Sequence, residues 1–435
     1  MSFKKTCILL LLALLSVGEL LAQPLFTRVF GGDSYDFGAE VIQLADSSYM
    51  IAGTTGSYGL ESGQVTLIKT DTSGYVEWQK TYGGQYADRA ESMVESSDGN
   101  LLIAGTTETT DKSYQFYALK LTYDGDTIWT RKYGGNDWDF CKQATALSDG
   151  GFALFGQSYT SGNANFKLVR INSHGDTLWT KSYGGAGFES GESIDTAADG
   201  GFYLAGITES FGAGAADMYV VKTDDVGDTL WTKTYGDVED DFCYGVGATS
   251  DTGYVLVGAT FNNTADQSDF IIRKEGGSSQ WIKHEATPGG STVTDVLIEP
   301  GTGDVTVVGY VQAGDFGKED GRIVRYGGLD GIWGGMAKSH GSQENDRFYD
   351  VKLCSDGGYV MVGTTAGYLN RFDDVYLVRG DEFGLTVNPE LGVDEIEIDG
   401  KNFSVAIGPN PITENSALLI QDYVGLIRQV EDDLH

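Results

Sequence analysis

A column of acidic residues is the first candidate for chemistry in this sequence. Its members recur at intervals of 50 to 55 residues: Asp36, Asp88, Asp139, Glu189, Asp241 and Asp346, with Ser291 in one further copy. Carboxylates that recur at one level of a repetitive fold could form a ring that attracts Ca²⁺ or a cationic ligand. They could equally cap a turn by accepting backbone N–H bonds. The sequence leaves both interpretations open, so the metal content is unknown.

Aromatic residues accompany part of this column. Tyr35, Trp138 and Phe188 each come directly before one of its acidic members. Exposed rings at these places could stack on a sugar or on a protein partner, or they could simply pack the loop. The acidic column and these three rings are the candidate ligand-binding residues.

Catalytic motifs are missing from the sequence. The only histidines are His174, His284, His340 and His435, and no HExxH, GxSxG, Walker-type loop or GxGxxG in a βαβ setting occurs. A pair of carboxylates for glycoside hydrolysis could still converge in space. We therefore assign no catalytic residue and no cofactor other than a Ca²⁺ that the acidic column could bind.

The acidic column belongs to a repeat that fills most of the chain. Its anchors are Trp78, Trp129, Trp179, Trp231, Trp281 and Trp333, spaced 51, 50, 52, 50 and 52 residues apart, with Phe26 in the same place 52 residues before Trp78. Three further positions recur at a fixed distance from the anchor in most copies. They are a turn glycine four residues before it, an aspartate twenty after it and a glycine twenty-seven after it. The chain therefore contains seven copies.

Each copy divides into four short strand-like runs. In one copy these runs are ESIDTAA, GFYLAGI, DMYVVKT and TLWTKTY, joined by tight turns. Four antiparallel strands that recur every ~50 residues are typical of a β-propeller blade. The chain starts with a lone fourth-type strand at Phe26–Phe30, and its last copy ends after three strands at Asp374–Gly380. The N-terminal strand can therefore complete the last blade and close the ring.

We therefore predict an all-β fold, a seven-bladed β-propeller of four-stranded blades closed by the N-terminal strand, with a short β-type C-terminal tail. The repeated glycine in the second strand should allow close backbone approach where blades converge. The tryptophan and the tyrosine four residues later should pack on the adjacent blade. Periodic Lys and Arg residues should form structural ion pairs.

The loops differ between the two faces of such a ring. Turns between strands one and two and between strands three and four are uniform, whereas the loops from strand two to three and from blade to blade vary. We call the side that carries the latter loops the variable face, and we expect binding there.

Charge and cysteine content limit the partners. The formal charge is −34, which disfavours nucleic acid and anionic membranes. Cys7 lies in the leader, and we expect Cys141, Cys243 and Cys354 to be small buried residues rather than a disulfide framework or a metal site. No stretch after the leader reaches the ~20 apolar residues of a membrane span.

Residues 1–22 read as a signal peptide, with Lys4 and Lys5 before a short apolar run and a cleavage site after Ala22. This leader predicts a secreted protein. We divide the remainder into a propeller at 23–385, a linker at 386–400 and a C-terminal segment at 401–435, and we expect a monomer.

Three family resemblances add to these expectations. The hairpin YVVKTDDVGDTLWTKTYG resembles the tryptophan-docking repeat of pyrroloquinoline-quinone dehydrogenases, which implies that the tryptophan locks adjacent blades. The fuller pattern is similar to repeat propellers of exported bacterial and archaeal surface proteins. The segment Gly392–Ile420, with Pro409, Asn410 and Pro411, resembles the beginning of the C-terminal sorting domain of type IX secretion, here in partial form. This resemblance implies the type IX secretion machinery as a partner and a location at the outer cell surface.

The favoured function is a non-catalytic scaffold for protein or carbohydrate binding, or adhesion, through the variable face. The alternatives are a secreted enzyme, either a polysaccharide hydrolase or lyase or a quinoprotein-like oxidoreductase, and a purely structural surface protein.

Overall fold

The structure, a computed structural model, describes residues 23–160, 162–262, 267–277, 279–285, 289–312, 316–368, 372–386, 394–398, 401–407 and 418–421. The signal peptide at 1–22 and the Pro409–Pro411 motif lie outside the described residues, so both stay predictions. In the part that is described, no helix is long and apolar enough to cross a membrane.

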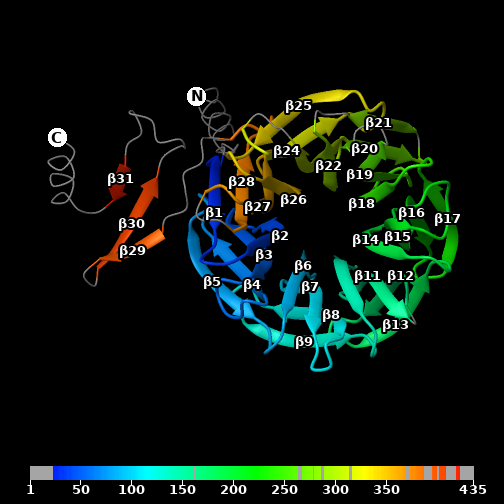
Figure 1. The fold of residues 1–435 in the computed structure, drawn as a ribbon, viewed down its shortest axis with the longest axis horizontal. Helices are drawn as coiled ribbons and strands as arrows, with labels where there is room; N and C mark the ends of the chain where they lie inside the picture. Colours follow the sequence, from blue (N-terminus) through cyan, green and yellow to red (C-terminus); the bar gives the residue numbers. More distant parts are fainter. Residues whose placement is uncertain are drawn as a thin grey trace, which may run out of the picture.

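Seven four-stranded antiparallel sheets stand around a central channel, as predicted (Figure 1). Blade 1 comprises β2 (Asp36–Gln43), β3 (Tyr49–Thr55), β4 (Gln64–Thr70) and β5 (Val76–Tyr82). Blade 2 comprises β6 (Asp88–Glu95), β7 (Leu101–Glu108), β8 (Tyr114–Leu121) and β9 (Thr127–Tyr133). Blade 3 comprises β10 (Asp139–Ala146), β11 (Phe152–Thr160), β12 (Asn163–Ile171) and β13 (Thr177–Tyr183). Blade 4 comprises β14 (Glu189–Thr196), β15 (Phe202–Thr208), β16 (Asp217–Thr223) and β17 (Thr229–Tyr235).

The remaining blades follow the same plan. Blade 5 comprises β18 (Asp241–Ala248), β19 (Tyr254–Asn262), β20 (Gln267–Glu275) and β21 (Trp281–Glu285). Blade 6 comprises β22 (Ser291–Ile298), β23 (Val305–Gln312), β24 (Glu319–Tyr326) and β25 (Trp333–His340). Blade 7 comprises β26 (Asp346–Leu353), β27 (Tyr359–Thr365), β28 (Asp374–Gly380) and β1 (Phe26–Phe30). The first strand of each blade lies next to the channel and is called its inner strand (Figure 1).

The N-terminal strand closes the ring, as the sequence predicts. Strand β1 pairs antiparallel with β28, with Phe26 opposite Arg379 and Phe30 opposite Val375. The first strand of the propeller therefore completes the last blade, and no blade keeps an unpaired edge at this seam. Three further strands, β29 (Asp394–Ile398), β30 (Lys401–Ile407) and β31 (Leu418–Gln421), form a separate sheet in the β-type tail.

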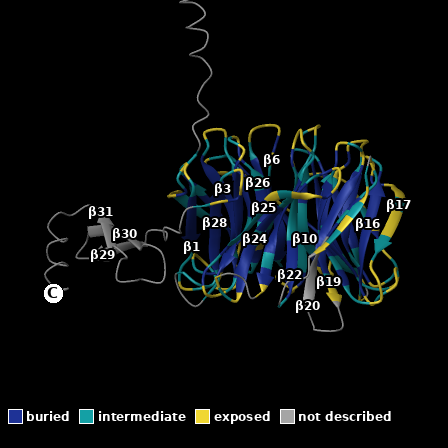
Figure 2. Cartoon of the chain, turned by 90° about the horizontal axis from the view of Figure 1, so that it is seen from above, coloured by how far each residue is buried: buried dark blue, intermediate teal, exposed yellow. Residues whose placement is uncertain are grey.

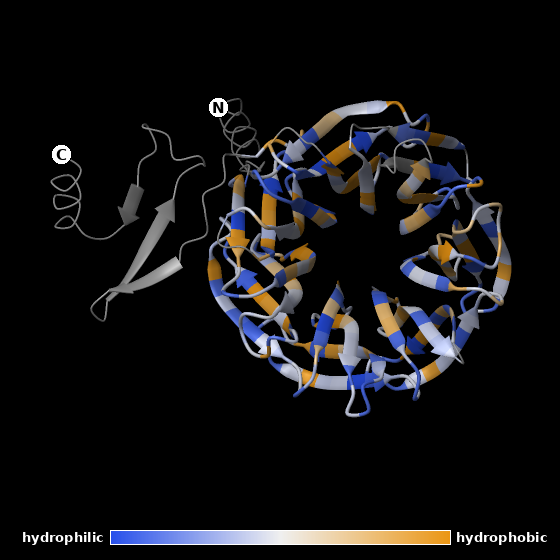
Figure 3. Ribbon diagram, viewed as in Figure 1, coloured by the Kyte–Doolittle hydropathy of each residue, from blue (hydrophilic) through white to orange (hydrophobic). Residues whose placement is uncertain are grey.

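The hydrophobic core lies between blades, because neighbouring blades cover both faces of each sheet. One cluster joins Met50 and Leu67 of blade 1 to Met93 and Leu101 of blade 2. Middle strands such as β3 and β16 are buried at every residue, whereas the outer strand β17 is mostly exposed (Figure 2). Apolar residues accordingly gather within the blades, as the hydropathy colours of Figure 3 show.

The tryptophan column packs against the next blade, as predicted, except for Trp333, which is 61% exposed. A Cβ on the turn glycine Gly227 would lie 2.7 Å from the ring of Trp179, and the hydroxyl of Tyr183 donates a 2.7 Å hydrogen bond to the Gly227 carbonyl. The same pair of contacts joins Trp129 and Tyr133 to Gly175. Outer strands are therefore fastened by stacking and by a backbone hydrogen bond.

The periodic basic residues form structural ion pairs. Third-strand cations reach the aspartate of the turn between the first two strands of their own blade: Lys120–Asp98, Arg170–Asp149, Lys222–Asp199, Lys274–Asp251 and Arg379–Asp356. Three blades differ from this pattern. In blade 1, Lys69 pairs with Glu77 at 2.7 Å, and in blade 5 the periodic Arg273 pairs with Glu275 while its neighbour Lys274 reaches Asp251. In blade 6, Arg325 donates hydrogen bonds to Tyr359 and to the Gly334 carbonyl. Lys80 and Lys181 instead reach an aspartate in the turn of the next blade.

Every inner strand carries a β-bulge at its fourth residue. The pairing register with the second strand shifts there in all seven blades, for example between Gly191 and Ser193. The repeated glycine of the second strand lies opposite this bulge. A Cβ on Gly206 would lie 1.9 Å from the carbonyl oxygen of Ser190, and the other six glycines show the same clash at 1.8–2.0 Å. The predicted close approach therefore exists, and its shortest contact lies within each blade rather than between blades.

Substituting Gly206 with alanine is expected to destabilise the propeller by about 1–3 kcal/mol or more, because a Cβ would overlap a backbone oxygen that cannot rotate away. Gly135→Ala is the matched control, since a Cβ at Gly135 meets nothing within 4 Å. Urea unfolding of both variants measures the effect. Equal midpoints for the two would contradict the role given to the bulge contact.

Candidate binding face and central channel

The seven bulge residues line one pocket in the central channel. They are Ala39, Glu91, Lys142, Glu192, Tyr244, Thr294 and Tyr349, in order from blade 1 to blade 7. The pocket has a volume of about 820 Å³. Residues of the β3–β4 loop, such as Glu61 and Ser62, also line it, so it opens on the variable face.

Blades 2 to 4 contribute a charged arc to this ring. The ammonium of Lys142 lies 3.5 Å from the carboxylate of Glu192, which raises the pKa of Lys142. Burial raises the pKa of Glu91, against the opposing effect of Lys142 and Arg89. The arc therefore places two carboxyl groups on either side of one ammonium.

Blades 5 to 7 contribute a neutral, hydroxyl-bearing arc of Tyr244, Thr294 and Tyr349. Burial raises the pKa of Tyr244 to about 12, so this hydroxyl stays protonated. Above the arc, the Arg347 guanidinium lies 4.9 Å from the centre of the Tyr310 ring and pairs with Glu319. The two halves of the channel thus differ in chemistry.

The residue after each bulge links neighbouring inner strands. Its side chain accepts a hydrogen bond from a backbone N–H of the next blade: Glu40 from Met93, Ser92 from Ala144, Gln143 from Ile194, Ser193 from Val246, Asp295 from Val351 and Asp350 from Val41. Gly245 of blade 5 has no side chain for this bond. Six of the seven junctions are joined in this way, among the residues that the structure describes.

One lysine balances three of these buried carboxylates. The ammonium of Lys352 lies 2.6 Å from Asp350 and 2.9 Å from Glu40. Burial alone would lower the pKa of Lys352. The carboxylates of Asp350, Glu40 and Asp295 together raise this pKa well above its usual value. Burial raises the pKa of Asp350 to about 6 despite this lysine.

The acidic column predicted from the sequence lies buried at the start of the inner strands. Each of its six members is at most 3% exposed. Each accepts a backbone hydrogen bond of 2.6–3.1 Å from the residue four positions earlier: Gly32, Gly84, Gly135, Gly185, Asp237 and Ser342 are the donors. The capping interaction is therefore present in all six copies, while ligand binding by these carboxylates stays a prediction.

The metal-ligating side chains of the described residues do not cluster into a metal site. Among the residues that the structure describes, no group of three or more His, Cys, Asp or Glu could hold a metal ion. Cys141, Cys243 and Cys354 are free and buried, as predicted. Burial also raises the pKa of Cys354 to about 12, so this thiol stays protonated.

A second polar column escaped the sequence analysis. It begins the third strands with Gln64, Gln115, Asn165, Asp217, Asp320 and Asp374. All but Gln64 lie against the glycine that follows the outer strand. A Cβ on Gly236, for example, would meet both Asp217 and Asp241. Polar residues at the same place in otherwise apolar strands are the signal that could have revealed this column.

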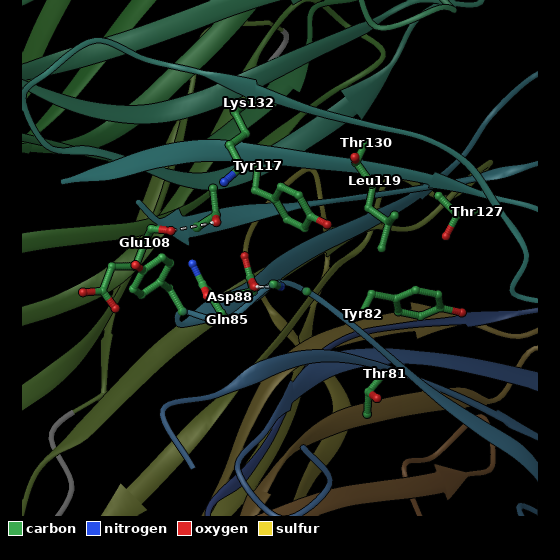
Figure 4. A pocket seen from close by; sticks show the side chains of 14 residues that line it. Thr81, Tyr82, Gln85, Asp88, Glu108, Tyr117, Leu119, Thr127, Thr130 and Lys132 are labelled. Carbon is green, nitrogen blue, oxygen red and sulfur yellow. Dashed lines mark hydrogen bonds between the residues drawn. The ribbon is translucent and has the colours of Figure 1, made fainter. Parts of the chain in front are cut away.

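Asp88 of the acidic column also lines a cavity. This smaller cavity, of about 470 Å³, lies between blades 1 and 2 and also involves Tyr82, Tyr117 and Lys132 (Figure 4). Burial raises the pKa of Tyr117 to about 12, with a smaller effect of Asp88. The hydrogen bond from Gly84 already occupies one oxygen of Asp88.

Two of the predicted aromatic residues belong to one cluster on the variable face. Tyr159 joins them, with its ring centre 6.2 Å from both Trp138 and Phe188. Tyr114 and Phe140 complete this five-ring aromatic cluster. Trp138 is 50% exposed.

The third predicted ring lies elsewhere. Tyr35 lines the central pocket, where it stacks on Phe37 with the ring planes at 2°. It is 51% exposed. The structure therefore separates Tyr35 from the aromatic cluster and places it at the channel.

No family model matches the sequence, and no curated protein sequence does either. Solved structures that align with the chain include the Neurospora crassa Pan2 WD40 domain, at 10% identity over 82% of this chain and 99% of that one, with a TM-score of 0.49. YCF48 bound to D1 peptide aligns at 10% identity over 84% and 99%, with a TM-score of 0.48. A puromycin hydrolase aligns at 12% identity over 86% of this chain and 58% of that one, with a TM-score of 0.49.

Acidification from pH 7 to pH 5 is expected to stabilise the ring. Burial raises the pKa of Asp346 and of Asp350 to about 6, above the ~4 of an unfolded Asp. Their stabilising effect is complete below pH ~4 and is lost as the pH rises through about 6. The expected slope is ~1.4 kcal/mol per pH unit for each group within that window. Thermal unfolding at pH 5, 6 and 7 measures the change.

The variant Asp346→Asn should flatten this pH dependence, because it removes one of the two titrating groups while keeping an acceptor for Ser342. Asp126→Asn is the control, since the Asp126 side chain is 77% exposed. A pH dependence that is unchanged in Asp346→Asn would show that this carboxyl does not contribute to it.

Proposed function

We propose that this protein is an exported, non-catalytic scaffold at the outer cell surface, where its variable face binds a protein or a glycan in adhesion. The leader at 1–22 and the tail resemblance at 392–420 support export by the type IX secretion machinery. The formal charge of −34 keeps a single chain soluble, which supports a monomer.

The observation that carries this proposal is the aromatic cluster. Its five rings come from blades 2 to 4 and from loops that vary between copies. The Trp138 indole is half-exposed and rests on the rings of Tyr114, Phe140 and Tyr159. Exposed aromatic rings held in this way are typical anchors of binding interfaces. The edge-to-face contacts fix Trp138 in place, so little side-chain entropy is lost when a partner binds.

A second candidate is a secreted polysaccharide hydrolase or lyase. It is favoured by Glu91, a carboxyl of raised pKa in the channel, with the carboxylate of Glu192 nearby across Lys142. Glycoside cleavage uses such a pair, one protonated as the acid and one ionised. Reducing-end release from polysaccharides, abolished in Glu91→Gln, would favour this candidate over the scaffold.

Trp138→Ala is expected to weaken binding of the full chain to cells of the producing organism by about tenfold or more, because it removes the exposed anchor of the cluster. Flow cytometry with fluorescent protein measures the binding. Trp333→Ala is the matched control, since Trp333 is 61% exposed but lies on the outer strand of blade 6.

Treating the cells identifies the partner. Binding lost after protease treatment indicates a protein, and binding lost after periodate oxidation indicates a glycan. If Trp138→Ala and Trp333→Ala bind as well as the unchanged chain, the aromatic cluster is not the binding surface.

A further inference from the structure

We infer that the central pocket binds a short neutral oligosaccharide, held between the charged arc of blades 2 to 4 and the tyrosine arc of blades 5 to 7. This inference rests on the binding role proposed above and names a ligand class for its channel. It uses residues that the sequence analysis did not select, apart from Tyr35 at the mouth.

The pocket is built on rigid elements. Each bulge residue is held by the strand ladder on both sides of the bulge and by the glycine contact beneath it, for example Glu192 between Gly191 and Ser193. A lining fixed in this way is preorganised, so few side chains must be ordered when a ligand enters. A volume of about 820 Å³ lies within the ~300–1,000 Å³ typical of ligand pockets.

The charges of the lining balance. It contains three basic residues, Arg89, Lys142 and Arg347, and three acidic residues, Glu61, Glu91 and Glu192. This neutrality contrasts with the formal charge of −34 on the whole chain. Because Lys142 already pairs with Glu192, and Arg347 with Glu319, a strongly charged ligand would have to break existing ion pairs. A neutral ligand leaves them intact.

The lining nevertheless offers hydrogen bonds of both kinds. Carboxylates such as Glu192 only accept, while guanidinium groups such as Arg89 only donate, and the Tyr349 hydroxyl does both. A sugar hydroxyl also donates and accepts at once, so adjacent hydroxyls can bridge such groups without carrying charge. Hydrogen bonds to ionised groups are the stronger ones.

The opposite arc offers apolar surface. Rings of Tyr244, Tyr310 and Tyr349 line the pocket, and Tyr35 stacked on Phe37 lines it as well. The C–H face of a pyranose packs on such rings, while its hydroxyls point sideways to polar partners. A sugar unit between the two arcs would satisfy both at once. A lysine side chain from a partner protein would satisfy only the carboxylates and would meet three cations.

Titration calorimetry of the full chain with neutral and charged probes tests this inference. The neutral probes are cello-, manno-, malto- and xylo-oligosaccharides of about two to six units, and the charged probes are tri-galacturonate and tri-lysine. Saturable binding of one neutral series is expected. No neutral binding at millimolar concentration, or tighter binding of either charged probe, would overturn the inference.

Ala39→Trp is the main variant, because it fills the channel from the smallest member of the ring and removes no observed interaction. It should weaken oligosaccharide binding by at least about tenfold, whereas Ala39→Ser should not. Glu91→Ala, which removes an acceptor without filling the space, should weaken binding even if Ala39→Trp fails to fold. If Ala39→Trp folds and binds the oligosaccharide with unchanged affinity, the central pocket is not the binding site.

Trp138→Ala separates the two proposals. It should keep its affinity for the oligosaccharide, since Trp138 does not line the central pocket. If oligosaccharides fail to bind while Trp138→Ala still loses cell binding, only the channel inference falls. If oligosaccharides bind and Trp138→Ala binds cells as well as the unchanged chain, only the proposal for the aromatic cluster is wrong.

Discussion

The contact between the second-strand glycine and the bulged inner strand is the constraint on which the rest of the channel depends. Because Gly206 has no Cβ, the carbonyl of Ser190 can lie where a side chain would stand. The inner strand then holds one extra residue, and that residue leaves the ladder and lines the channel. The shift also turns the following side chain toward the next blade, where it accepts a backbone N–H. One contact, repeated seven times, thus sets both the lining of the channel and the bonds between blades.

The sequence predicts the architecture well because the architecture is periodic. Anchors such as Trp179 recur at nearly fixed intervals, and the phase of the first strand predicts closure by Phe26–Phe30, which the pairing with β28 confirms. The bulge could not be predicted in the same way. Its residues range from Ala39 to Lys142 to Tyr349, so no residue type recurs at that place. The glycine column was visible, but the sequence does not tell which backbone approaches it.

In the candidate site, too, the repeated residues were predictable and the unrepeated ones were not. The acidic column was found because carboxylates recur in it, yet strand alternation alone could not tell whether Asp139 points to the channel or between blades. The backbone hydrogen bond and 1% exposure of Asp139 answer that question. Tyr159, which joins two of the predicted rings, has an aromatic counterpart in Phe261 of blade 5 but not in the neighbouring blades, so the repeat gives little signal for it. The residues proposed to bind a partner differ between copies, so the repeat pattern does not reveal them.

The seam between β1 and β28 has a further consequence for the order of the chain. Thr386 donates a hydrogen bond to the carbonyl of Phe26, so the two ends of the propeller meet in one blade. Closing a loop costs free energy that grows only with the logarithm of its length, roughly 0.6 kcal/mol for each doubling. The covalent break lies within blade 7, between β28 and β1, and packing does not require it to be there. The ring is closed, so a circularly permuted chain that begins at any other junction between blades could form the same seven sheets.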